Sequence, residues 1–366
     1  MVPTVERLLL GPGPSPVSAR VQRAMAAPVL SHLDPALISL LDQIRGRLRY
    51  VFGAAEDAFA FAVSGTGTAG MEAAVANVTR PGTHATVVVN GYFGDRLAQM
   101  LARYGATVSR IEREWGRAAD PEALERSLRD RGADVVAMVH AETSTGVLNP
   151  VSELCAIAAR HGALTIVDAV TSLGAHSVAT AEWGCDICYS CTQKGLGAPS
   201  GLAPIVFSAR AQRSSERSGS PPSFYFDLAL LKSYWLDRKY HHTISAPLVY
   251  ALSEALDVVA EEGLEARAQR HRDNHLRFAD GLTDLGLTLL PPPDERLWSL
   301  NAVVVPDGVD EAQVRRALLD ERSIEIGSGL GPLAGRIWRV GLMGSGSTAE
   351  NVDRLLDAYR SVLRRA

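Results

Sequence analysis

The surroundings of Lys194 point most directly to chemistry. This lysine stands in the segment SCTQKGLGAP (190–199), which follows an apolar run and contains small, polar and apolar residues but no acidic one. Removing water from around a lysine lowers its pKa, and the neutral amine can then form a Schiff base with a carbonyl compound. Because most lysines are solvated, this reading of Lys194 needs support from other residues.

Asp168 and a Gly/Thr-rich turn supply that support. Asp168 closes the apolar run ALTIVD (163–168), where a buried acid is costly unless it has a partner; that partner is either a structural one or the protonated ring nitrogen of a cofactor. The turn SGTGTAG (64–70) opens a helix and offers N–H groups, hydroxyls and a positive dipole end, which suit a phosphate. Its spacing fits no strict nucleotide motif, so a turn without ligand is the alternative. Together the phosphate turn, the acid and the lysine suggest pyridoxal phosphate.

The surrounding pattern is that of an α/β protein that positions these residues at one edge of a sheet. Continuous apolar runs separated by helical segments predict a parallel sheet that is buried on both faces, with ligands at the carboxyl ends of its strands. These runs lie at 58–63, 84–90, 134–140, 163–168, 186–190 and 203–208. The irregular stretch 211–224 is expected to be a surface loop.

The pattern changes beyond residue 245. Helical stretches at 246–261 and 264–285 precede three strand-like runs at 299–305, 323–327 and 336–342, and a helix at 348–363 closes the chain. We therefore expect an extended N-terminal segment (1–20), a large domain (21–255) and a smaller α+β domain (256–366).

Composition limits the classes of function. The 366 residues are 46% apolar and 21% charged, which excludes disorder as the main state. With 37 basic and 41 acidic residues the net charge is −4, so nothing electrostatic favours a nucleic-acid or membrane partner. No apolar run is long enough for a membrane span, and the N-terminus does not resemble a signal peptide. Four cysteines are too few for a disulfide scaffold, so we expect a cytoplasmic protein.

The sequence resembles the class V, fold-type I aminotransferases, specifically the alanine–glyoxylate and serine–glyoxylate group. The resemblance covers nearly the whole chain. It rests on LLLGPGPS (8–15), SGTGTAGMEAA (64–74), NGYFGDR (90–96), HAETSTGVLNP (140–150), IVDAVTSLGA (166–175), CTQKGLGAPSG (191–201), YHHT (240–243), IEIGSGLGP (324–332) and WRVGLMG (338–344). It implies a large domain with a mostly parallel seven-stranded sheet between helices, a small C-terminal domain and pyridoxal 5'-phosphate as the cofactor.

The resemblance also assigns roles to individual residues. Lys194 becomes the Schiff-base lysine and proton shuttle, and Asp168 the partner of the ring nitrogen. The other residues implied for cofactor binding are Thr66, Gly67, Thr68 and Gln193 at the phosphate, Phe93 at the ring face, Thr143 near the ring hydroxyl, and Tyr240 and Thr243 at the phosphate of the other subunit of a homodimer. At two of these positions the family often carries other residues, namely Trp where Phe93 stands and His where Thr68 stands.

For the substrate, the resemblance implies Arg339 as the clamp for a carboxylate, with Gly13 and His32 nearby. The expected reaction is transamination between alanine or serine and glyoxylate. Segments at 31–35, 114–116 and 226–235 also resemble bacterial ureidoglycine–glyoxylate aminotransferases, so (S)-ureidoglycine is an alternative donor. Transamination of 2-aminoethylphosphonate with pyruvate is a less favoured alternative.

Two other classes of enzyme fit the sequence less well. A desulfurase-type lyase needs a catalytic cysteine in a late loop, but Cys191 is the last cysteine of the chain. A nicotinamide dehydrogenase needs a glycine fingerprint near the start, which is not clear here.

Three clusters receive structural interpretations. Cys185, Cys188 and Cys191 have the spacing of metal ligands, but no fourth ligand follows; in a strand, Cys185 and Cys188 would point to opposite faces. The adjacent His241 and His242 are more typical of a structural role than of a metal site. The basic stretch 267–277 is expected to be a solvated helix face. We therefore expect no metal.

Overall fold

The computed structural model describes residues 5–365, and its central element is a sheet of seven strands. All neighbouring strands run parallel except for β10, which is antiparallel to both of its neighbours. This arrangement confirms the predicted mostly parallel seven-stranded sheet. In spatial order the strands are β2 (Phe59–Ser64), β10 (Leu202–Phe207), β9 (Ile187–Tyr189), β8 (Leu164–Asp168), β5 (Val135–Val139), β3 (His84–Val89) and β4 (Thr107–Glu112).

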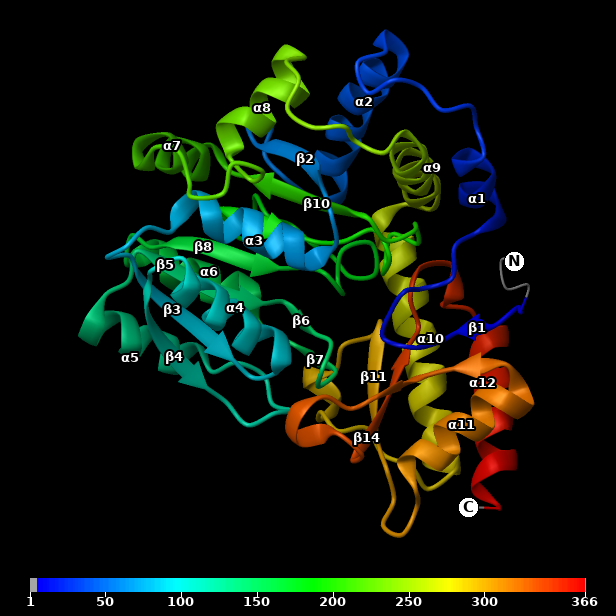
Figure 1. Ribbon diagram of the computed structural model, residues 1–366. Coiled ribbons are helices and arrows are strands. Elements are labelled where there is room, and N and C mark those ends of the chain that lie inside the picture. Colours follow the sequence, from blue (N-terminus) through cyan, green and yellow to red (C-terminus); the bar gives the residue numbers. More distant parts are fainter. Residues whose placement is uncertain (1–4, 366) are drawn as a thin grey trace.

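Helices cover both faces of this sheet. Two of them, α3 (Gly67–Val78) and α4 (Tyr92–Arg103), pack on one face, and α5 (Pro121–Arg131) and α6 (Val151–Arg160) pack on the other (Figure 1). The helices α2 (Pro35–Val51), α7 (Ala209–Ser218) and α8 (Leu228–Asp237) lie at the β2–β10 end. Because the inner strands are buried on both faces, they are continuous apolar runs rather than alternating ones.

The register of the sheet aligns the ends of the strands that carry the candidate residues. In the parallel pair β5–β8, Val139 lies opposite Asp168, and in the pair β8–β9, Asp168 lies opposite Tyr189. The three strands therefore end at a common edge, where the following loops meet. One of these loops continues into the short hairpin β6 (Ala141–Glu142) and β7 (Val147–Leu148).

The C-terminal part has its own small sheet and hydrophobic core. Two long helices, α9 (Ala246–Glu262) and α10 (Leu264–Asp284), lead into it, as the sequence predicted. The antiparallel sheet has the order β11-β14-β13, and its core includes the buried side chains of Trp338 and Tyr359. The remaining elements are β11 (Leu300–Val304), α11 (Glu311–Arg322), β12 (Ile324–Glu325), β13 (Gly327–Ser328), β14 (Ile337–Gly341), α12 (Ala349–Leu363) and 3-10 turns at Pro293–Glu295, Gly331–Leu333 and Gly344–Gly346.

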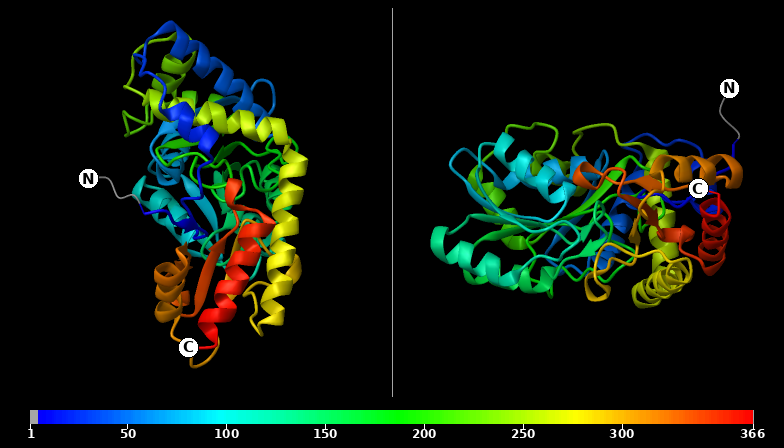
Figure 2. Two further views of the ribbon diagram at one scale, coloured as in Figure 1. Left: turned by 90° about the vertical axis from the view of Figure 1, so that its right-hand side faces the viewer. Right: turned by 90° about the horizontal axis from the view of Figure 1, so that it is seen from below.

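The expected boundary between the large and the small domain, at residues 255/256, falls inside α9, and its exact place stays a proposal. Hydrophobic side chains of α9 as far as Val259 pack in the core of the large sheet, whereas Phe278 and Leu282 of α10 belong to the small core. Figure 2 shows α9 and α10 running along one side of both parts.

The N-terminal segment connects the two parts of the molecule. Its strand β1 (Leu8–Leu9) pairs in parallel with β12 of the small domain. A few residues later the backbone N–H of Ser15 donates to the carbonyl of Gln193 in the large domain, at 2.9 Å. Helix α1 (Ala19–Met25) then packs against α9. Residues 1–4 of the expected segment lie outside the described residues.

The prediction of a loop at 211–224 was wrong for its first half, because α7 extends through Ser218. Ser208 begins this helix by accepting a hydrogen bond from the backbone N–H of Ala211, at 3.1 Å, and Ala211 and Ser215 form its buried face. In the described part of the chain, no helix has the length and apolar character needed to cross a bilayer.

Candidate active site

Asp168 lies at the carboxyl end of β8, with only 2% of its surface exposed. One carboxylate oxygen accepts from the backbone N–H of Val170 at 2.8 Å, and the other accepts from the hydroxyl of Tyr189 at 2.8 Å. Burial nevertheless raises the pKa of Asp168 to about 6. A cation beside this buried carboxylate would stabilise its charged form. The predicted partner, a protonated ring nitrogen, is such a cation.

Lys194 lies in the loop between β9 and β10, and it is buried at the same site. Its Nζ donates a hydrogen bond to the carbonyl oxygen of Pro12, and Gly13 lies directly against its side chain, where a Cβ would stand 2.7 Å from the lysine Cε. Burial lowers the pKa of Lys194, although the charges of Asp168 and Glu142 oppose this shift. The structure therefore brings Lys194, Asp168 and Gly13 together.

The Gly/Thr-rich turn presents free polar groups at the start of α3. Thr66 precedes the helix without capping it through its side chain, and the side chains of Thr66 and Thr68 are exposed. A Cβ at position 67 would stand only 2.9 Å from the side chain of Val170, so glycine allows the turn to lie this close to Val170. The Oε1 atom of Gln193 is buried without any hydrogen-bond partner. A buried amide of this kind satisfies its hydrogen bonds with a ligand, so these residues fit a phosphate group.

Arg339 comes from β14 of the small domain and is buried at the boundary between the two parts. Its Nε donates to the carbonyl of Ser328 at 2.6 Å, and its Nη1 to the carbonyl of Thr143 at 3.5 Å. Burial lowers the pKa of Arg339 to about 10. Thr143 in turn shares a hydrogen bond with the hydroxyl of Thr171, just after Asp168. Arg339 and Thr143 therefore join the same site from opposite sides.

Phe93 lies in the first turn of α4, beside an arginine that sequence reasoning did not assign. The guanidinium of Arg96 lies 5.1 Å from the ring centroids of both Phe93 and Tyr92, and it donates to the hydroxyl of Thr68 at 3.1 Å. Its charge also acts to lower the pKa of Asp168. Arg96 therefore connects Phe93 with the Gly/Thr-rich turn, and its position three residues after Phe93 was the available signal.

His32 lies beside Tyr240, apart from the residues described above, and Tyr240 and Thr243 are exposed whereas His32 is half-buried. The rings of His32 and Tyr240 are 5.2 Å apart, and Tyr240 is 64% exposed. Nearby, His242 shares a hydrogen bond with the hydroxyl of Ser64 at 3.1 Å, which holds this segment beside the phosphate turn. None of their contacts among the described residues is with the lysine or the aspartate of the site.

Two further residues of the site escaped sequence reasoning. Tyr189 donates to Asp168, but only the pairing of β8 with β9 brings the two together. Glu142 is fully buried beside the start of α4 and accepts from the backbone N–H groups of Phe93 and Gly94. Its segment, HAETSTG, carried the family resemblance, which was the only signal.

The expectation of a solvated face at 267–277 was wrong for one side of α10. Arg267, His271 and His275 are buried, because this side of the helix packs against both parts of the molecule. The guanidinium of Arg267 donates to the carbonyls of Gly174 and Gly195, both at 2.8 Å. It therefore supports the loop that carries the candidate lysine.

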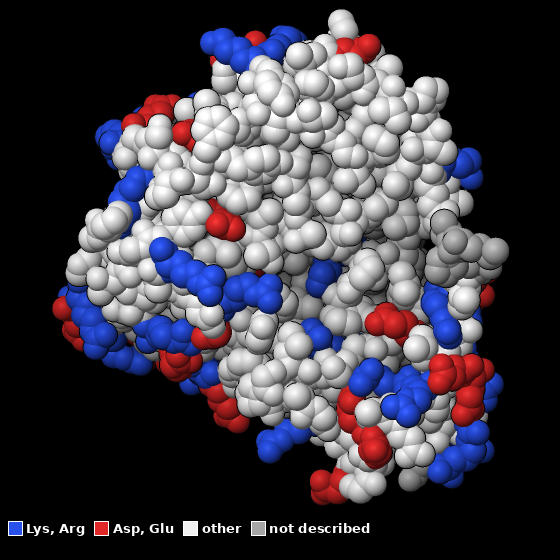
Figure 3. All heavy atoms as spheres, viewed as in Figure 1, with Lys and Arg blue, Asp and Glu red and all other residues white. Residues whose placement is uncertain are grey.

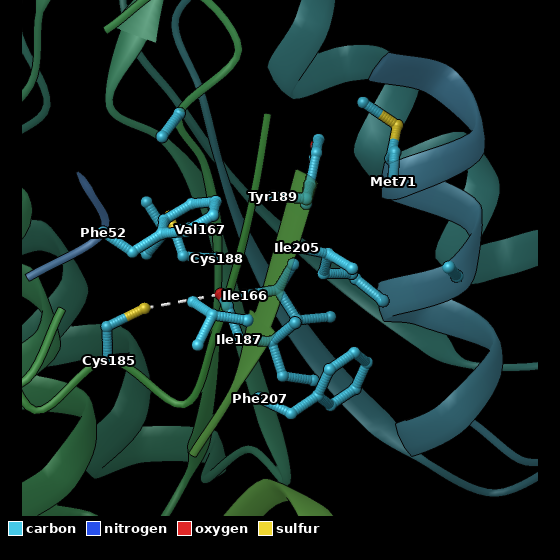
Figure 4. Packing of buried hydrophobic residues seen from close by; sticks show 14 of the residues in the cluster. Phe52, Met71, Ile166, Val167, Cys185, Ile187, Cys188, Tyr189, Ile205 and Phe207 are labelled. Atoms are coloured by element: carbon cyan, nitrogen blue, oxygen red, sulfur yellow. Dashed lines mark hydrogen bonds between the residues drawn. The ribbon is translucent and has the colours of Figure 1, made fainter. Parts of the chain in front are cut away.

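The cysteine argument also needs correction. Cys185 precedes β9 instead of belonging to it, so its side chain and that of Cys188 lie on the same side of the strand, facing away from Met71 of α3 (Figure 4). Cys191 lies elsewhere, near Lys194. Among the described residues, no group of three or more His, Cys, Asp or Glu side chains is arranged to hold a metal ion.

Comparison with known proteins agrees with this architecture. The crystal structure of an alanine–glyoxylate aminotransferase from Nostoc sp. is 45% identical, with a TM-score of 0.96, over 100% of this chain and 98% of the other. That of ureidoglycine–glyoxylate aminotransferase from Bacillus subtilis is 38% identical, with a TM-score of 0.97, over 100% and 94%. The alanine–glyoxylate aminotransferase of Drosophila melanogaster is 37% identical over 98% of this chain and 92% of its own.

The sheet and the edge at which its loops meet define the fold-type I architecture of the pyridoxal-phosphate-dependent aminotransferases. The family model described as aminotransferase class-V matches residues 17–355. The chain belongs to the class-V aminotransferase family and is a transaminase.

Proposed function

We propose that this transaminase uses pyridoxal 5'-phosphate to transfer the amino group of alanine or serine to glyoxylate, giving glycine and a 2-oxo acid. One observation carries the proposal: a lysine, an aspartate and an arginine from distant parts of the chain are buried within electrostatic reach of one another. The names of the similar Nostoc and Drosophila proteins support alanine and glyoxylate as substrates.

The side chains of the site fit this cofactor. Thr66, Gly67, Thr68 and Gln193 would hold its phosphate, since they offer free N–H groups, hydroxyls and a buried amide with an unused hydrogen-bonding atom. Phe93 offers a π-face, Thr143 a buried hydroxyl, and Asp168 a carboxylate for the ring nitrogen. When bound, the pyridine ring of the cofactor supplies an electron sink for the carbon that loses its proton.

Lys194 would anchor the cofactor and then move a proton. Its lowered pKa leaves a larger neutral fraction of the amine, which is the form that can attack a carbonyl carbon and accept a proton at Nζ from the substrate Cα. The carbonyl of Pro12 gives the free amine a defined resting position. Gly13 has no side chain that would collide with the aliphatic part of Lys194.

Asp168 and Arg339 would act on opposite ends of the reacting molecules. Asp168 would hold a proton at the ring nitrogen, because a buried carboxylate that keeps its charge favours a cation beside it. Arg339 uses Nε and Nη1 to fix its own orientation. Its remaining donors would bind the substrate carboxylate, with Gly13 of the same subunit on the side of the amino donor. His32 lies beside Tyr240 and would reach the amino donor only in the site of the other subunit.

We further propose that the active unit is a homodimer, with Tyr240 and Thr243 of one subunit at the cofactor phosphate of the other. The exposure of Tyr240 supports this arrangement, because an aromatic ring in water gains from being covered. A cytoplasmic location is likewise proposed, and four buried cysteines without disulfides are compatible with it.

A second donor has specific support. The similar Bacillus subtilis enzyme is named for ureidoglycine and glyoxylate, so (S)-ureidoglycine is the alternative donor. His32 would then contact the ureido group in the site of the other subunit, together with Tyr240. Transamination of 2-aminoethylphosphonate is a weaker alternative, because a phosphonate needs cationic contacts beyond those assigned to a carboxylate.

Spectroscopy of the purified protein tests the cofactor assignment. The protein supplied with pyridoxal 5'-phosphate should absorb in the visible range, and reduction with borohydride should leave the pyridoxyl group on Lys194, as peptide mass mapping would show. Lys194→Ala should keep its fold but lose the label and turnover. A label on Lys232 or Lys239 instead would overturn the assignment.

A panel of amino donors tests the substrates. Alanine, serine and freshly prepared ureidoglycine, each paired with glyoxylate and with pyruvate, should show the highest kcat/KM for a small donor with glyoxylate. The panel should include 2-aminoethylphosphonate with pyruvate. If the phosphonate donor is preferred, the proposed reaction is wrong, although the cofactor assignment stands.

A further inference from the structure

Glu142 is a buried carboxylate that the proposed reaction does not use. It lies in β6 and has no exposed surface. One of its oxygens, Oε2, accepts from the backbone N–H groups of Phe93 and Gly94, both at 3.2 Å. The other, Oε1, accepts from the backbone N–H and the hydroxyl of Ser144, at 3.1 and 2.6 Å. A single side chain therefore joins two segments that lie far apart in the sequence.

The position of this carboxylate follows from the start of α4. Gly91 immediately precedes the helix, and a Cβ there would collide with the side chain of Glu142 and stand 2.6 Å from the hydroxyl of Ser144. The carboxylate thus approaches the N–H groups of the first turn, where the partial positive charge of the helix favours an anion. Without these donors the desolvation of Glu142 would be costly, since burial alone already raises its pKa.

Each of the two joined segments carries a residue of the active site. The first turn of α4 carries Phe93, the proposed ring-face residue. On the other side, Thr143 follows Glu142 directly, and its carbonyl accepts the hydrogen bond from Arg339. The distance between the ring face and the carboxylate clamp therefore depends on the hydrogen bonds that Glu142 accepts from four donors, three backbone N–H groups and one hydroxyl.

We propose that Glu142 is a positioning residue, which holds Phe93 at the face of the cofactor ring and Thr143 with Arg339 at the substrate carboxylate. It touches neither molecule itself. This inference rests on the proposed function, because it assigns Glu142 a part in the same site. It goes further by linking affinity for the cofactor and affinity for the substrate to one buried side chain.

Glu142→Gln tests this link with little change in size. An amide has only one accepting oxygen, so its NH₂ group must face N–H donors on one side or the other. We expect the dissociation constant of pyridoxal 5'-phosphate, measured by titration of the apoprotein, to rise about tenfold, as for the loss of one charge-assisted hydrogen bond. We expect KM for the amino donor to rise by a similar factor, with a smaller change in kcat.

Gly91→Ala disturbs the same contact from the other side and leaves the carboxylate in place. Its added methyl group competes for the space of the Glu142 side chain. We therefore expect this variant also to raise both the dissociation constant of pyridoxal 5'-phosphate and KM for the amino donor. Because the φ of Gly91 is 179°, this substitution adds no backbone strain at that position.

Asp186→Asn is the matched control. Asp186 is also buried, and it accepts from the backbone N–H of Thr165 and the hydroxyl of Ser208, both at 3.0 Å, at the end of the sheet remote from Lys194. Its loss should lower the Tm of the apoprotein but leave cofactor dissociation and KM unchanged. The inference is overturned if Glu142→Gln behaves like this control, or if it binds cofactor and donor as the wild type does. If the wild-type protein takes up no pyridoxal 5'-phosphate, the proposed function fails first and this inference fails with it.

Discussion

The chemistry of single residues in this protein depends on ionisable groups that are held away from water. Burial lowers the pKa of Lys194 and raises that of Asp168, so in the isolated protein both groups are shifted toward their neutral forms. Asp168 therefore gains from a bound cation that favours its charged form, whereas Lys194 is held closer to the neutral form that can attack a carbonyl carbon. Binding energy for the cofactor and readiness for catalysis then have the same physical origin.

Asp168→Asn should stabilise the apoprotein in a pH-dependent way. Burial raises the pKa of Asp168 to about 6 from 3.8, so the folded state binds this proton more tightly than the unfolded chain does. Ionisation of Asp168 therefore lowers the free energy of unfolding as the pH rises above about 4. The loss levels off above about pH 6, where it reaches at most about 3 kcal/mol. Thermal denaturation of the apoproteins should show a more favourable difference in Tm, variant minus wild type, at about pH 7.5 than at about pH 4.5.

The same substitution should lower turnover of the loaded enzyme about 100-fold or more, because a neutral amide cannot hold the ring nitrogen protonated. A difference in Tm that does not depend on pH would contradict the electrostatic explanation. Full activity of the variant would contradict the assigned role of Asp168.

Arg339→Lys should weaken binding of carboxylate substrates while preserving the positive charge. A lysine cannot donate to the carbonyls of Ser328 and Thr143 and still offer a planar pair of donors to the substrate. We expect KM for alanine and for glyoxylate to rise about 10- to 100-fold. Steady-state kinetics measure this change, and unchanged KM values would remove Arg339 from the substrate site.

At the scale of elements, the N-terminal segment couples the small domain to the lysine loop. Its strand β1 pairs with β12, and six residues after Leu9 the hydroxyl and N–H of Ser15 bond to the carbonyls of Lys194 and Gln193. Between these anchors, Pro12 and Gly13 lie against the lysine side chain. A short extended segment can therefore fix the position of the reactive amine.

Gly13→Ala should test this contact. The added Cβ would stand 2.7 Å from Cε of Lys194, at a φ of +112° that is unfavourable for alanine. We expect kcat to fall about tenfold or more, since misplacement of a catalytic group by a fraction of an ångström has effects of this size.

Gly82→Ala is the control for backbone strain alone. Gly82 has a φ of +93° and no atom within 4 Å of its added Cβ. This variant should lose some stability on denaturation but keep kcat. Equal losses of kcat in the two variants would mean that strain, and not contact with Lys194, explains the result.

At the scale of the whole molecule, charge is unevenly distributed over the surface. Figure 3 shows that the upper right of this face, over α1, α2 and α9, carries few charged residues, whereas the lower part is dense in both signs. Phe224 is 73% exposed, and Tyr240 is 64% exposed. A surface with few charges and the exposure of large aromatic rings are both typical of proteins that associate through an interface, and both support the proposed homodimer.

Complementation between two inactive variants should test whether the sites are shared. Lys194→Ala lacks the reactive amine, and Thr243→Ala lacks a proposed contact to the partner's phosphate. A mixed dimer contains one site with both residues intact. Random exchange should therefore restore about a quarter of the wild-type activity, since half of the dimers are mixed and each has one complete site.

Each variant must be assayed alone under the same conditions, and native mass spectrometry, which separates the two variants by mass, must confirm that mixed dimers form. If Thr243→Ala has full activity by itself, Thr243 makes no important contact. If exchange occurs without recovery of activity, each subunit holds a complete site of its own, and the proposal of shared sites is wrong.

Hydrophobic periodicity and local turn chemistry are short-range properties, and they predicted six of the seven strands, the long helices α9 and α10, and the lysine, aspartate and Gly/Thr-rich turn as candidates. The seventh strand, β4, has mostly exposed or half-buried side chains and no continuous apolar run, so a seven-stranded sheet was implied only by the family resemblance. The sequence alone failed where contacts depend on long-range packing. The hydrogen bond between Tyr189 and Asp168 needs strand pairing, and the contact of Arg96 with Thr68 needs two helices side by side. The burial of Arg267 and the bridging position of Glu142 likewise depend on which surfaces meet. Only the tertiary structure decides such contacts, because burial and electrostatic environment are set by neighbours that are distant along the chain.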